Sequence, residues 1–378
     1  MEFFGSAFTL VTGYIVPFLF VLTIVVFFHE LGHFLVARWC GVGVETFSIG
    51  FGREIVGWND KHGTRWRLSL IPLGGYVKFV DDSGEASTPD LEALEAMTEE
   101  QKARSFHLKP LWAKSAIVSA GPIANFLLAI VIFSFVFSLN GKQLTLPIVD
   151  SVQSDSAAAV AGLKPGDRIL SIDGNSIESF LDLQRVVSTS AGLELTFEVD
   201  RAGEILTLRA TPRRKMNVDQ FGNEQNIGLL GVGRSISAED IIYQKYTIPE
   251  AIGAGVWETW FIAERTVTFI GGMITGREST ENLGGPIRIA KVSGQIATLG
   301  IGALINWAGL LSVSIGLLNL FPIPMLDGGH LMFYAIEAVR GRPLSDRMKD
   351  IGFRVGLALV VMLMAFATWN DILSLATS

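Results

Sequence analysis

Four long apolar runs divide the chain, and the polar and charged residues gather in the segments between them. The runs cover residues 14–36, 116–139, 304–320 and 352–369. At a rise of about 1.5 Å per residue, each run is close to the length that spans the hydrocarbon core of a bilayer. The pattern therefore predicts a polytopic α-helical membrane protein with about four transmembrane helices.

The region between the first and second runs has a strand-like pattern. Residues 46–57 and 64–80 alternate apolar and polar side chains, and four glycines interrupt the alternation: Gly50, Gly52, Gly74 and Gly75. Such a pattern is typical of β-hairpins. Open strand edges cannot face lipid, so any part that enters the membrane must pack on protein or line a wet cavity. We expect a membrane-associated β-hairpin region, followed over residues 81–104 by an acidic, solvated loop with a short helix.

A soluble module lies between the second and third runs. Residues 147–212 combine short strand patterns, two short helical patterns and turn residues. The sequence Ala-Gly-Leu-Lys-Pro-Gly-Asp-Arg-Ile-Leu at 161–170, followed by Ile172-Asp173-Gly174, closely resembles a PDZ domain of the bacterial protease-associated kind. The resemblance implies an inserted α+β PDZ domain whose groove binds an extended peptide, or part of a substrate ectodomain, as an added strand. A spacer without a ligand is the alternative.

A further helical pattern covers residues 251–273. Aromatic and charged side chains share it, among them Trp257, Trp260, Phe261 and Phe269 with Glu258, Glu264 and Arg265. Three charges in one stretch argue against a membrane span. They favour an amphipathic helix at the membrane interface, anchored by its aromatic residues.

Composition agrees with a membrane protein and removes several other classes. Of the 378 residues, 49% are hydrophobic and 18% are charged, which is too apolar for an ordinary soluble protein. Cys40 is the single cysteine, so an internal disulfide framework and a four-cysteine zinc site are excluded. The net charge of −7 and the lack of a lysine and arginine cluster give no basic surface. We expect membrane lipid as a partner and no nucleic acid.

The positions of the basic residues predict the orientation. The segments between the first and second runs and between the third and fourth are rich in lysine and arginine, whereas residues 1–13 and the tail after Trp369 have none. Basic segments stay in the cytosol, so both termini and the long 140–303 section should lie outside it. The expected order is 1–40 first transmembrane helix, 41–111 hairpin region and acidic loop, 112–140 second transmembrane helix, 147–212 PDZ domain, 213–303 extracytoplasmic segment with the amphipathic helix, 304–330 third transmembrane helix, 331–350 cytosolic loop, and 351–378 fourth transmembrane helix and tail.

The first run carries the candidate chemistry. His29-Glu30-Leu31-Gly32-His33 is an H-E-x-x-H motif, and on a helix this spacing puts both imidazoles on one face as two zinc ligands. Glu30 flanks the metal and can accept a proton from the attacking water. Ionisable side chains are costly inside a membrane, so three within five residues favour a metal site over packing. The run also lacks a basic segment ahead of it, so we expect a retained helix rather than a signal peptide.

A catalytic zinc site normally has three protein ligands and one open position, so a third ligand is needed. The segment 319–330 supplies two candidates, Asp327 and His330. Two prolines break the helix there and two glycines allow a tight turn, so irregular backbone can present either side chain. The residues alone leave both candidates open.

The second run contains Gly121-Pro122 and, one turn later, Asn125. A proline inside a helix frees a backbone carbonyl that must find another partner. Asn125 is an amide at membrane depth. It either packs helices together or contacts the active site or the substrate.

Three features together resemble the site-2 protease family of intramembrane zinc metalloproteases, in particular a single-PDZ form of its bacterial sigma-E regulator protease (RseP) branch. They are the H-E-x-x-H motif, the interposed PDZ domain, and the third-run pattern Asn-x-x-Pro-x-Pro-x-Leu-Asp-Gly-Gly at 319–329. The resemblance extends to Gly121-Pro122-x-x-Asn125 and to Gly284-Gly285-Pro286-Ile287. It implies Asp327 as the third ligand and a substrate-holding role for Asn319, with Asn125 as a weaker candidate. The chain departs from the enteric form, because residues 213–248 are too short for a second PDZ domain.

The activity implied by the resemblance is zinc-dependent cleavage of single-span membrane proteins already trimmed on their extracytoplasmic side. Anti-sigma factors and remnant signal peptides are such transmembrane substrates. The implied location is the bacterial cytoplasmic (inner) membrane, with the PDZ domain in the periplasm. A membrane adaptor with structural zinc is one alternative, but Glu30 argues against it because a structural site needs no carboxylate beside an open position. A metal transporter is the other, but the runs show little further polarity.

Overall fold

The computed structural model describes residues 11–82, 97–218, 224–234, 242–275 and 284–377. The chain forms two compact units. The first takes in Met1–Ser134, Ala254–Ala263 and Gly284–Asp371, and the second takes in Phe135–Gly253, Glu264–Leu283 and Ile372–Ser378. Most of the predicted acidic loop, residues 83–96, lies outside the described residues, and its short helix is α4 (Glu99–Ala103).

Four helices in the described part of the chain are long and apolar enough to cross a membrane, and they coincide with the four predicted runs. These stretches are Val11–Trp39, Leu111–Leu139, Ile301–Asn319 and Arg347–Leu373. They belong to η1 (Val11–Ile15) with α2 (Val16–Trp39), to α5 (Leu111–Asn140), to α10 (Ile301–Asn319) and to α12 (Asp346–Thr377). The predicted number of candidate spans is confirmed by helix length and composition.

The other helices are shorter or more polar. They are α8 (Ile248–Ile274), α9 (Pro286–Ala297) and α11 (Asp327–Arg340), besides α4 and the small helices of the second unit. α8 has 27 residues but is not among the four candidate spans. It coincides with the stretch predicted to be amphipathic, and its place at the membrane interface stays a prediction.

The β-hairpin region consists of two long strands, β1 (Val44–Asn59) and β2 (Arg65–Phe79). Both strands change register along their length, because Ile49 of β1 pairs with Gly75 and also with Leu68 of β2. The second half of β1 returns to pair with the first half of β2, where Trp58 lies opposite Trp66. Residues 75–77 therefore pair with β1 on one side only, and no described strand pairs with their other edge.

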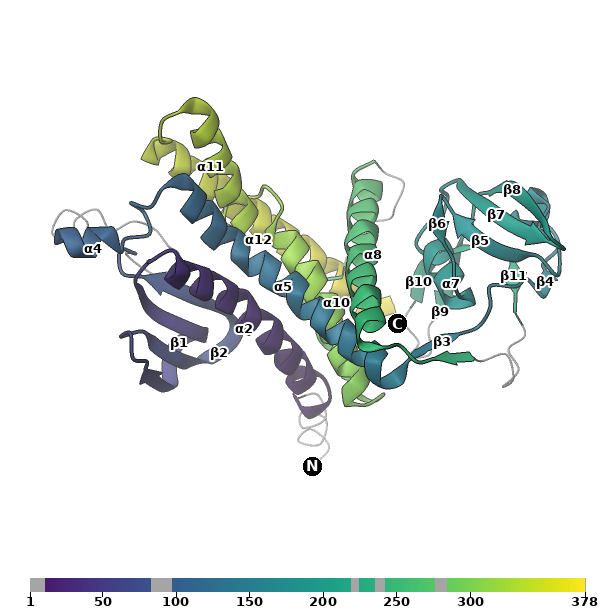
Figure 1. Ribbon diagram of the computed structural model, residues 1–378, viewed down its shortest axis with the longest axis horizontal. Coiled ribbons are helices and arrows are strands. Elements are labelled where there is room, and N and C mark those ends of the chain that lie inside the picture. Colours follow the sequence, from purple (N-terminus) through teal and green to yellow (C-terminus); the bar gives the residue numbers. More distant parts are fainter. Residues whose placement is uncertain (1–10, 83–96, 219–223, 235–241, 276–283, 378) are drawn as a thin grey trace. The chain divides into compact units, whose positions relative to one another are not determined.

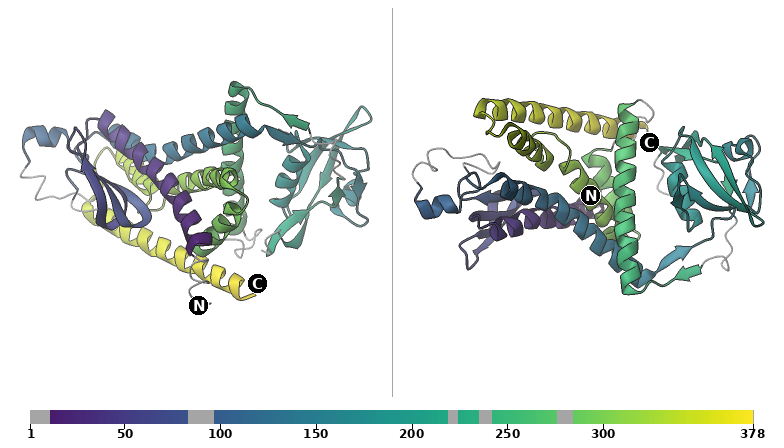
Figure 2. Two further views of the ribbon diagram at one scale, coloured as in Figure 1. Left: turned by 90° about the horizontal axis from the view of Figure 1, so that it is seen from below. Right: turned by 45° about the horizontal axis from the view of Figure 1, so that its top comes forward.

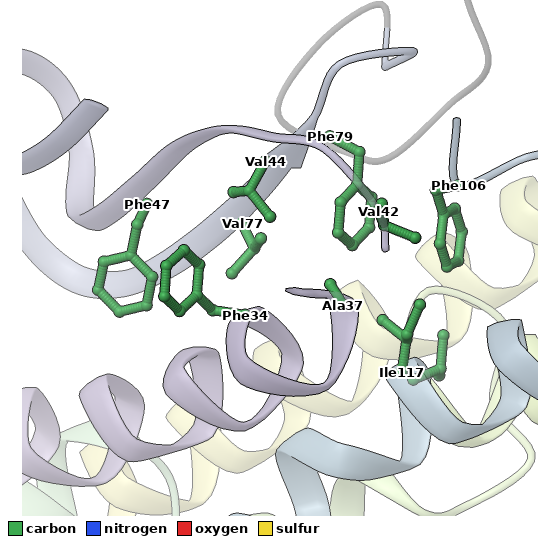
Figure 3. Packing of buried hydrophobic residues seen from close by; sticks show 10 residues of the cluster. Phe34, Ala37, Val42, Val44, Phe47, Val77, Phe79, Phe106 and Ile117 are labelled. Carbon is green, nitrogen blue, oxygen red and sulfur yellow. The ribbon is translucent and has the colours of Figure 1, made fainter. Parts of the chain in front are cut away.

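The sheet lies along α2 in every view (Figures 1 and 2). A buried apolar cluster fills the space between them: Phe34, Ala37, Val42, Val44, Phe47, Val77, Phe79, Phe106, Ile117 and Val118. Figure 3 shows Phe47 and Val77 of the sheet pointing toward Phe34 on α2. The Phe34 and Phe47 rings meet edge to face with centroids 5.5 Å apart. This packing fixes the sheet on the helix that carries the H-E-x-x-H motif.

The second unit contains a four-stranded sheet in the order β6-β5-β7-β8. The strands are β5 (Arg168–Ile172), β6 (Asn175–Ser176), β7 (Leu195–Arg201) and β8 (Glu204–Ala210), with helices α6 (Ala157–Ala161) and α7 (Phe180–Ser188). Ser179 begins α7 with a capping box, since its hydroxyl oxygen accepts a hydrogen bond from the backbone N–H of Asp182 and the Asp182 carboxylate accepts one in return. These elements are short strands and two short helices, the kinds of element that the pattern of residues 147–212 predicts.

The compact module continues beyond the predicted boundary at residue 212. Its remaining strands are β9 (Arg213–Val218), β10 (Glu224–Leu229) and β11 (Val232–Gly233), and β11 pairs with β4 (Ser151–Val152) near the start of the module. The backbone N–H of Ala158 also donates to the carbonyl of Leu230, 2.8 Å away. Long-range pairing of this kind leaves no signal in a local pattern, so the range predicted from the sequence does not include these strands.

Candidate metal centre and active site

α2 presents two imidazole nitrogens to one point within its membrane-spanning stretch. Residues four apart on a helix lie one turn apart on the same face, and His29 Nε2 lies 3.2 Å from His33 Nε2. The two rings meet edge to face, with centroids 4.8 Å apart. Both side chains are largely buried. The spacing predicted from the sequence therefore places both rings where they can share one metal ion.

Asp327 brings a carboxylate to the same point from far along the chain. Its Oδ2 atom lies 3.2 Å from His29 Nε2, and its Oδ1 atom lies 3.5 Å from His33 Nε2. The ligand atoms of these three residues all lie within 4.8 Å of one another. Of the two candidates for a third ligand, the structure thus brings Asp327 to the histidines.

An irregular turn holds this carboxylate in place. α10 ends at Asn319, and Asp327 is the first residue of α11. Met325 between them has a φ of 88°, which a non-glycine residue adopts only where the surrounding structure holds it. A Cβ at Gly328 would lie 2.3 Å from two backbone carbonyl oxygens, and one at Gly329 would lie 2.4 Å from another. The turn that positions the carboxylate has no space for larger residues at these two positions.

The three side chains suit a zinc ion. Zinc bonds of about 2.0–2.2 Å at tetrahedral angles place two ligand atoms roughly 3.3–3.6 Å apart, and the separations here are 3.2, 3.2 and 3.5 Å. Asp327 Oδ2 is buried and, despite lying near His29, has no hydrogen-bond partner. A buried polar atom without a partner is costly, and a bound cation removes that cost. His29, His33 and Asp327 would hold the metal and leave a fourth position open for water or substrate.

α5 contacts the ring of His33 through Ile117 and Gly121. His33 Nδ1 lies 2.8 Å from the backbone carbonyl oxygen of Ile117 and donates a hydrogen bond to it when Nε2 binds a metal. A Cβ at Gly121 would lie 2.3 Å from His33 Nε2, so only glycine fits against the ring there. Pro122 lies inside α5 as predicted. Near this proline, α5 leaves space for the His33 ring at Gly121 and supplies the carbonyl oxygen of Ile117 as a hydrogen-bond acceptor.

Glu30 faces a cavity with a volume of about 690 Å³. The cavity is lined on one side by the metal cluster and on another by residues 73–77 of β2. Gly75 lies close to Glu30, because a Cβ at residue 75 would stand 2.9 Å from Glu30 Cγ. Gly75, on a strand with one unpaired edge, thus lies beside the carboxylate that flanks the candidate metal ligands.

The remaining candidates are placed differently. Asn319 and His330 both line the cavity, but the ring of His330 packs against Phe353 with centroids 5.3 Å apart and is not part of the three-residue metal cluster.

Asn125 is fully buried and is absent from the cavity lining. Its amide lies 3.2 Å from His29 Nδ1. Asn125 thus contacts a candidate metal ligand, and its role stays a prediction.

A second group of acidic and histidine side chains, Asp81, Asp82 and His107, also gathers within 4.8 Å. Here the carboxylates already have partners. The Asp81 carboxylate accepts hydrogen bonds from Ser105 and from two backbone N–H groups, and the Asp82 carboxylate contacts His107 Nε2 at 3.0 Å and accepts from the backbone N–H of Phe79. The group fastens the end of β2 to the chain before α5. Sequence analysis missed this clamp, although adjacent aspartates directly after a strand were a signal for it.

The fold and the metal cluster together define a class, that of zinc metalloproteases with several membrane-spanning helices. The model of peptidase family M50 matches residues 17–363, and the chain belongs to this family. The resemblance to the site-2 proteases and to their RseP branch is thereby confirmed. The chain is a zinc metalloprotease, and its metal cofactor is zinc.

Relatives cover almost the whole chain. A protein of Agrobacterium fabrum whose name describes a zinc metalloprotease is 50% identical over 364 residues, which cover 96% of this chain and 97% of that protein. The regulator of sigma-E protease RseP of Escherichia coli is 31% identical over 452 aligned positions, which cover 94% of this chain and 97% of RseP. The alignment with RseP is longer than this chain, so RseP has inserted residues that this chain lacks.

Among solved structures, the PDZ domain of an SdrC-like protein from Listeria monocytogenes covers 22% of this chain and 82% of its own. The identity is 22% and the TM-score is 0.18. A score this low does not establish a common fold, so the PDZ assignment of the second unit stays an interpretation of its sequence.

Proposed function

We propose that this zinc metalloprotease cuts its substrates inside the membrane. The substrates would be single-span membrane proteins already trimmed on their extracytoplasmic side, such as anti-sigma factors or remnant signal peptides. One observation carries the proposal: on a membrane-spanning helix, Glu30 flanks three converging ligand atoms and faces a cavity of about 690 Å³. The name of RseP, a regulator of sigma-E protease, supports a substrate of the anti-sigma type.

The residues of the site would divide the reaction between them. When bound, zinc supplies Lewis-acid chemistry that activates water and polarises the scissile carbonyl. The Glu30 carboxylate accepts the proton of the attacking water and donates it to the leaving amide nitrogen. Asn319, at the end of α10 and on the cavity wall, offers its amide to the substrate backbone.

A helical substrate must unwind before its peptide bond becomes reachable. Residues 75–77 offer unpaired backbone groups beside Glu30, and an extended peptide that pairs with them would lie within the cavity. The clamp formed by Asp81 and Asp82 supports this role, since it fixes the end of the same strand. Edge pairing would give affinity through the main chain, so it fits an enzyme that cuts substrates of different sequence.

The proposed setting is a bacterial cytoplasmic membrane with both termini outside the cytosol and the second unit in the periplasm. His29 follows fifteen residues after Tyr14, or roughly 22 Å of helix, which puts the zinc site toward the cytosolic half of the span. An extracytoplasmic module would then act on access to the site rather than on the scissile bond. Exclusion of bulky ectodomains by that module is the regulation we propose.

Glu30→Gln tests the proposal directly. The substitution removes the proton acceptor and leaves the ligands in place, so zinc content should stay at one ion per chain while cleavage falls by about 10²–10⁴-fold. The purified full chain should be assayed in vesicles with a trimmed single-span substrate, and the same variant should be used to collect the membrane segments that accumulate in cells. Near-normal turnover by zinc-loaded Glu30→Gln would reject the mechanism.

A further inference from the structure

Asn125 on α5 contacts a candidate metal ligand on α2. The residue is fully buried on α5, and its amide nitrogen Nδ2 lies 3.2 Å from His29 Nδ1 on α2. Its amide oxygen Oδ1 is buried and has no hydrogen-bond partner. The backbone carbonyl of Asn125 accepts a hydrogen bond from Ser312 Oγ on α10, 2.8 Å away. The side chain therefore meets the far nitrogen of a candidate metal ligand, with an acceptor left over.

We infer that Asn125 is a positioning residue that orients His29 for the metal by accepting a hydrogen bond from His29 Nδ1–H through its amide oxygen. The inference rests on the proposed role of His29 as a ligand. A neutral imidazole has one nitrogen that donates and one that accepts. When Nε2 gives its lone pair to a metal, the proton is on Nδ1, and this N–H needs an acceptor.

The amide can meet that need without moving its neighbours. An amide has nearly the same shape after a half-turn that exchanges its oxygen and nitrogen. In the present orientation, Nδ2 faces His29 Nδ1 and would set two donors against each other once the metal is bound. After the half-turn, the partnerless Oδ1 faces Nδ1–H. The exchange satisfies the orphaned acceptor and the new donor together.

His33 also has an acceptor for its Nδ1–H, in this case a backbone carbonyl. His33 Nδ1 faces the backbone carbonyl of Ile117 at 2.8 Å. Both imidazoles are thus supported from α5, one by the main chain and one by a side chain. Acceptors of this kind fix the tautomer and ring angle of a metal-bound histidine, and their loss typically weakens metal binding by about 10–100-fold. Of these two acceptors, only the side chain of Asn125 can be removed by a substitution.

The experiment compares three variants of the full chain in detergent by competition with a zinc chelator and by the visible spectrum of the Co²⁺ form. Asn125→Leu keeps similar bulk without an acceptor, and its zinc affinity should fall by about 10–100-fold, with an altered Co²⁺ spectrum. Asn125→Asp restores an acceptor and should bind zinc within a few-fold of the wild type. Ser312→Ala removes a hydrogen bond to the Asn125 backbone only, and its affinity should not change. Thermal unfolding of each metal-free variant controls for damage to the fold.

Wild-type affinity and spectrum in Asn125→Leu would overturn the inference, and so would an Asn125→Asp variant as weak as Asn125→Leu. If Asn125→Leu does not fold, ¹⁵N spectra of the zinc-loaded wild type decide: a protonated Nδ1 on His29 supports the inference, and an unprotonated one rejects it. His29→Ala separates this inference from the proposed function. Loss of zinc in His29→Ala with normal binding by Asn125→Leu would reject the positioning role alone. Retention of zinc in His29→Ala would reject the proposed ligand set as well.

Discussion

Gly121 on α5 lies directly against the ring of His33 on α2, so close that a Cβ at residue 121 would stand 2.3 Å from the ring atom Nε2. That atom is the one that faces Asp327. Contact between the two helices therefore controls where a candidate metal ligand points. A single methyl group placed there acts on the site without touching the chemistry of any ligand.

Gly121→Ala should weaken zinc binding by at least about tenfold, because the added methyl group pushes the His33 ring away from Asp327. Zinc content after dialysis against a chelator measures the effect. Gly302→Ala in α10 is the matched control, since a Cβ there meets nothing within 4 Å, and the replacement of a helical glycine should be neutral or stabilise by up to about 1 kcal/mol. Equal zinc retention in both variants would contradict the steric argument.

Asp327→Asn should lower zinc content and activity together, because a neutral amide replaces the charged ligand beside the two histidines. His330→Ala should leave zinc in place, since the His330 ring packs on Phe353 and lies outside the metal cluster. Metal analysis of both purified variants distinguishes the two candidates. The reverse order of zinc loss would identify His330 as the third ligand.

Reporter fusions test the orientation derived from the basic residues. Fusions after Asp81 and after Met348 should report the cytosol, and fusions after Gly203 and at Ser378 should report the opposite side. An alkaline phosphatase and a fluorescent protein, each active on one side only, give independent readings at each position. An extracytoplasmic signal at Asp81 would move the zinc site to the other leaflet and overturn the proposed topology.

Removal of the module tests how it regulates access. Deletion of residues 147–233 takes out the module through β11, and cleavage of an untrimmed substrate should rise while cleavage of a trimmed one changes much less. Recruitment of substrates by their newly exposed C-termini predicts the contrary, a slower cleavage of the trimmed substrate. Both substrates should be assayed with both enzymes. Loss of trimmed-substrate cleavage by a deletion variant that folds and binds zinc would reject exclusion in favour of recruitment.

The turn between β1 and β2 should be acid-sensitive. Burial raises the pKa of the Asp60 carboxyl, but hydrogen bonds outweigh it and lower this pKa to about 2; they come from Trp66 Nε1, the backbone N–H groups of His62 and Thr64, and Arg38. A lowered pKa means that ionised Asp60 stabilises the fold above the ordinary value of 3.8, and that this contribution is lost as pH falls toward about 2. Thermal unfolding in detergent should therefore depend on pH in this window more steeply for the wild type than for Asp60→Asn. Parallel pH profiles would refute the assignment.

The parts that sequence predicted well are those set by local spacing. Apolar runs of membrane-spanning length and the i, i+4 pair His29 and His33 depend only on the helix period, so the candidate spans and two candidate ligands could be placed in advance. The strands and helices of residues 147–212 also followed local turn and capping signals.

The parts that sequence could not settle depend on contacts between distant segments. The residues alone left Asp327 and His330 open, and only the family resemblance favoured Asp327; the turn after α10 brings Asp327 to the metal cluster and places His330 against Phe353. Asn125 was an ambiguous polar residue until α5 and α2 were side by side. The pairing of β11 with β4 could not be predicted, because the two strands are far apart in sequence.

The two strands that lead into and out of the module, β3 (Lys142–Leu144) and β12 (Ile242–Gln244), pair with each other in antiparallel register. The stretch enclosed by β3 and β12 therefore begins and ends at neighbouring points within the second unit. A domain whose two ends lie close together can be inserted between two segments of a host protein without changing the distance between those segments. Such a junction permits evolution to lengthen, duplicate or exchange the enclosed domain without reshaping the protease around it, and the inserted residues of RseP show that the length of this family is not fixed.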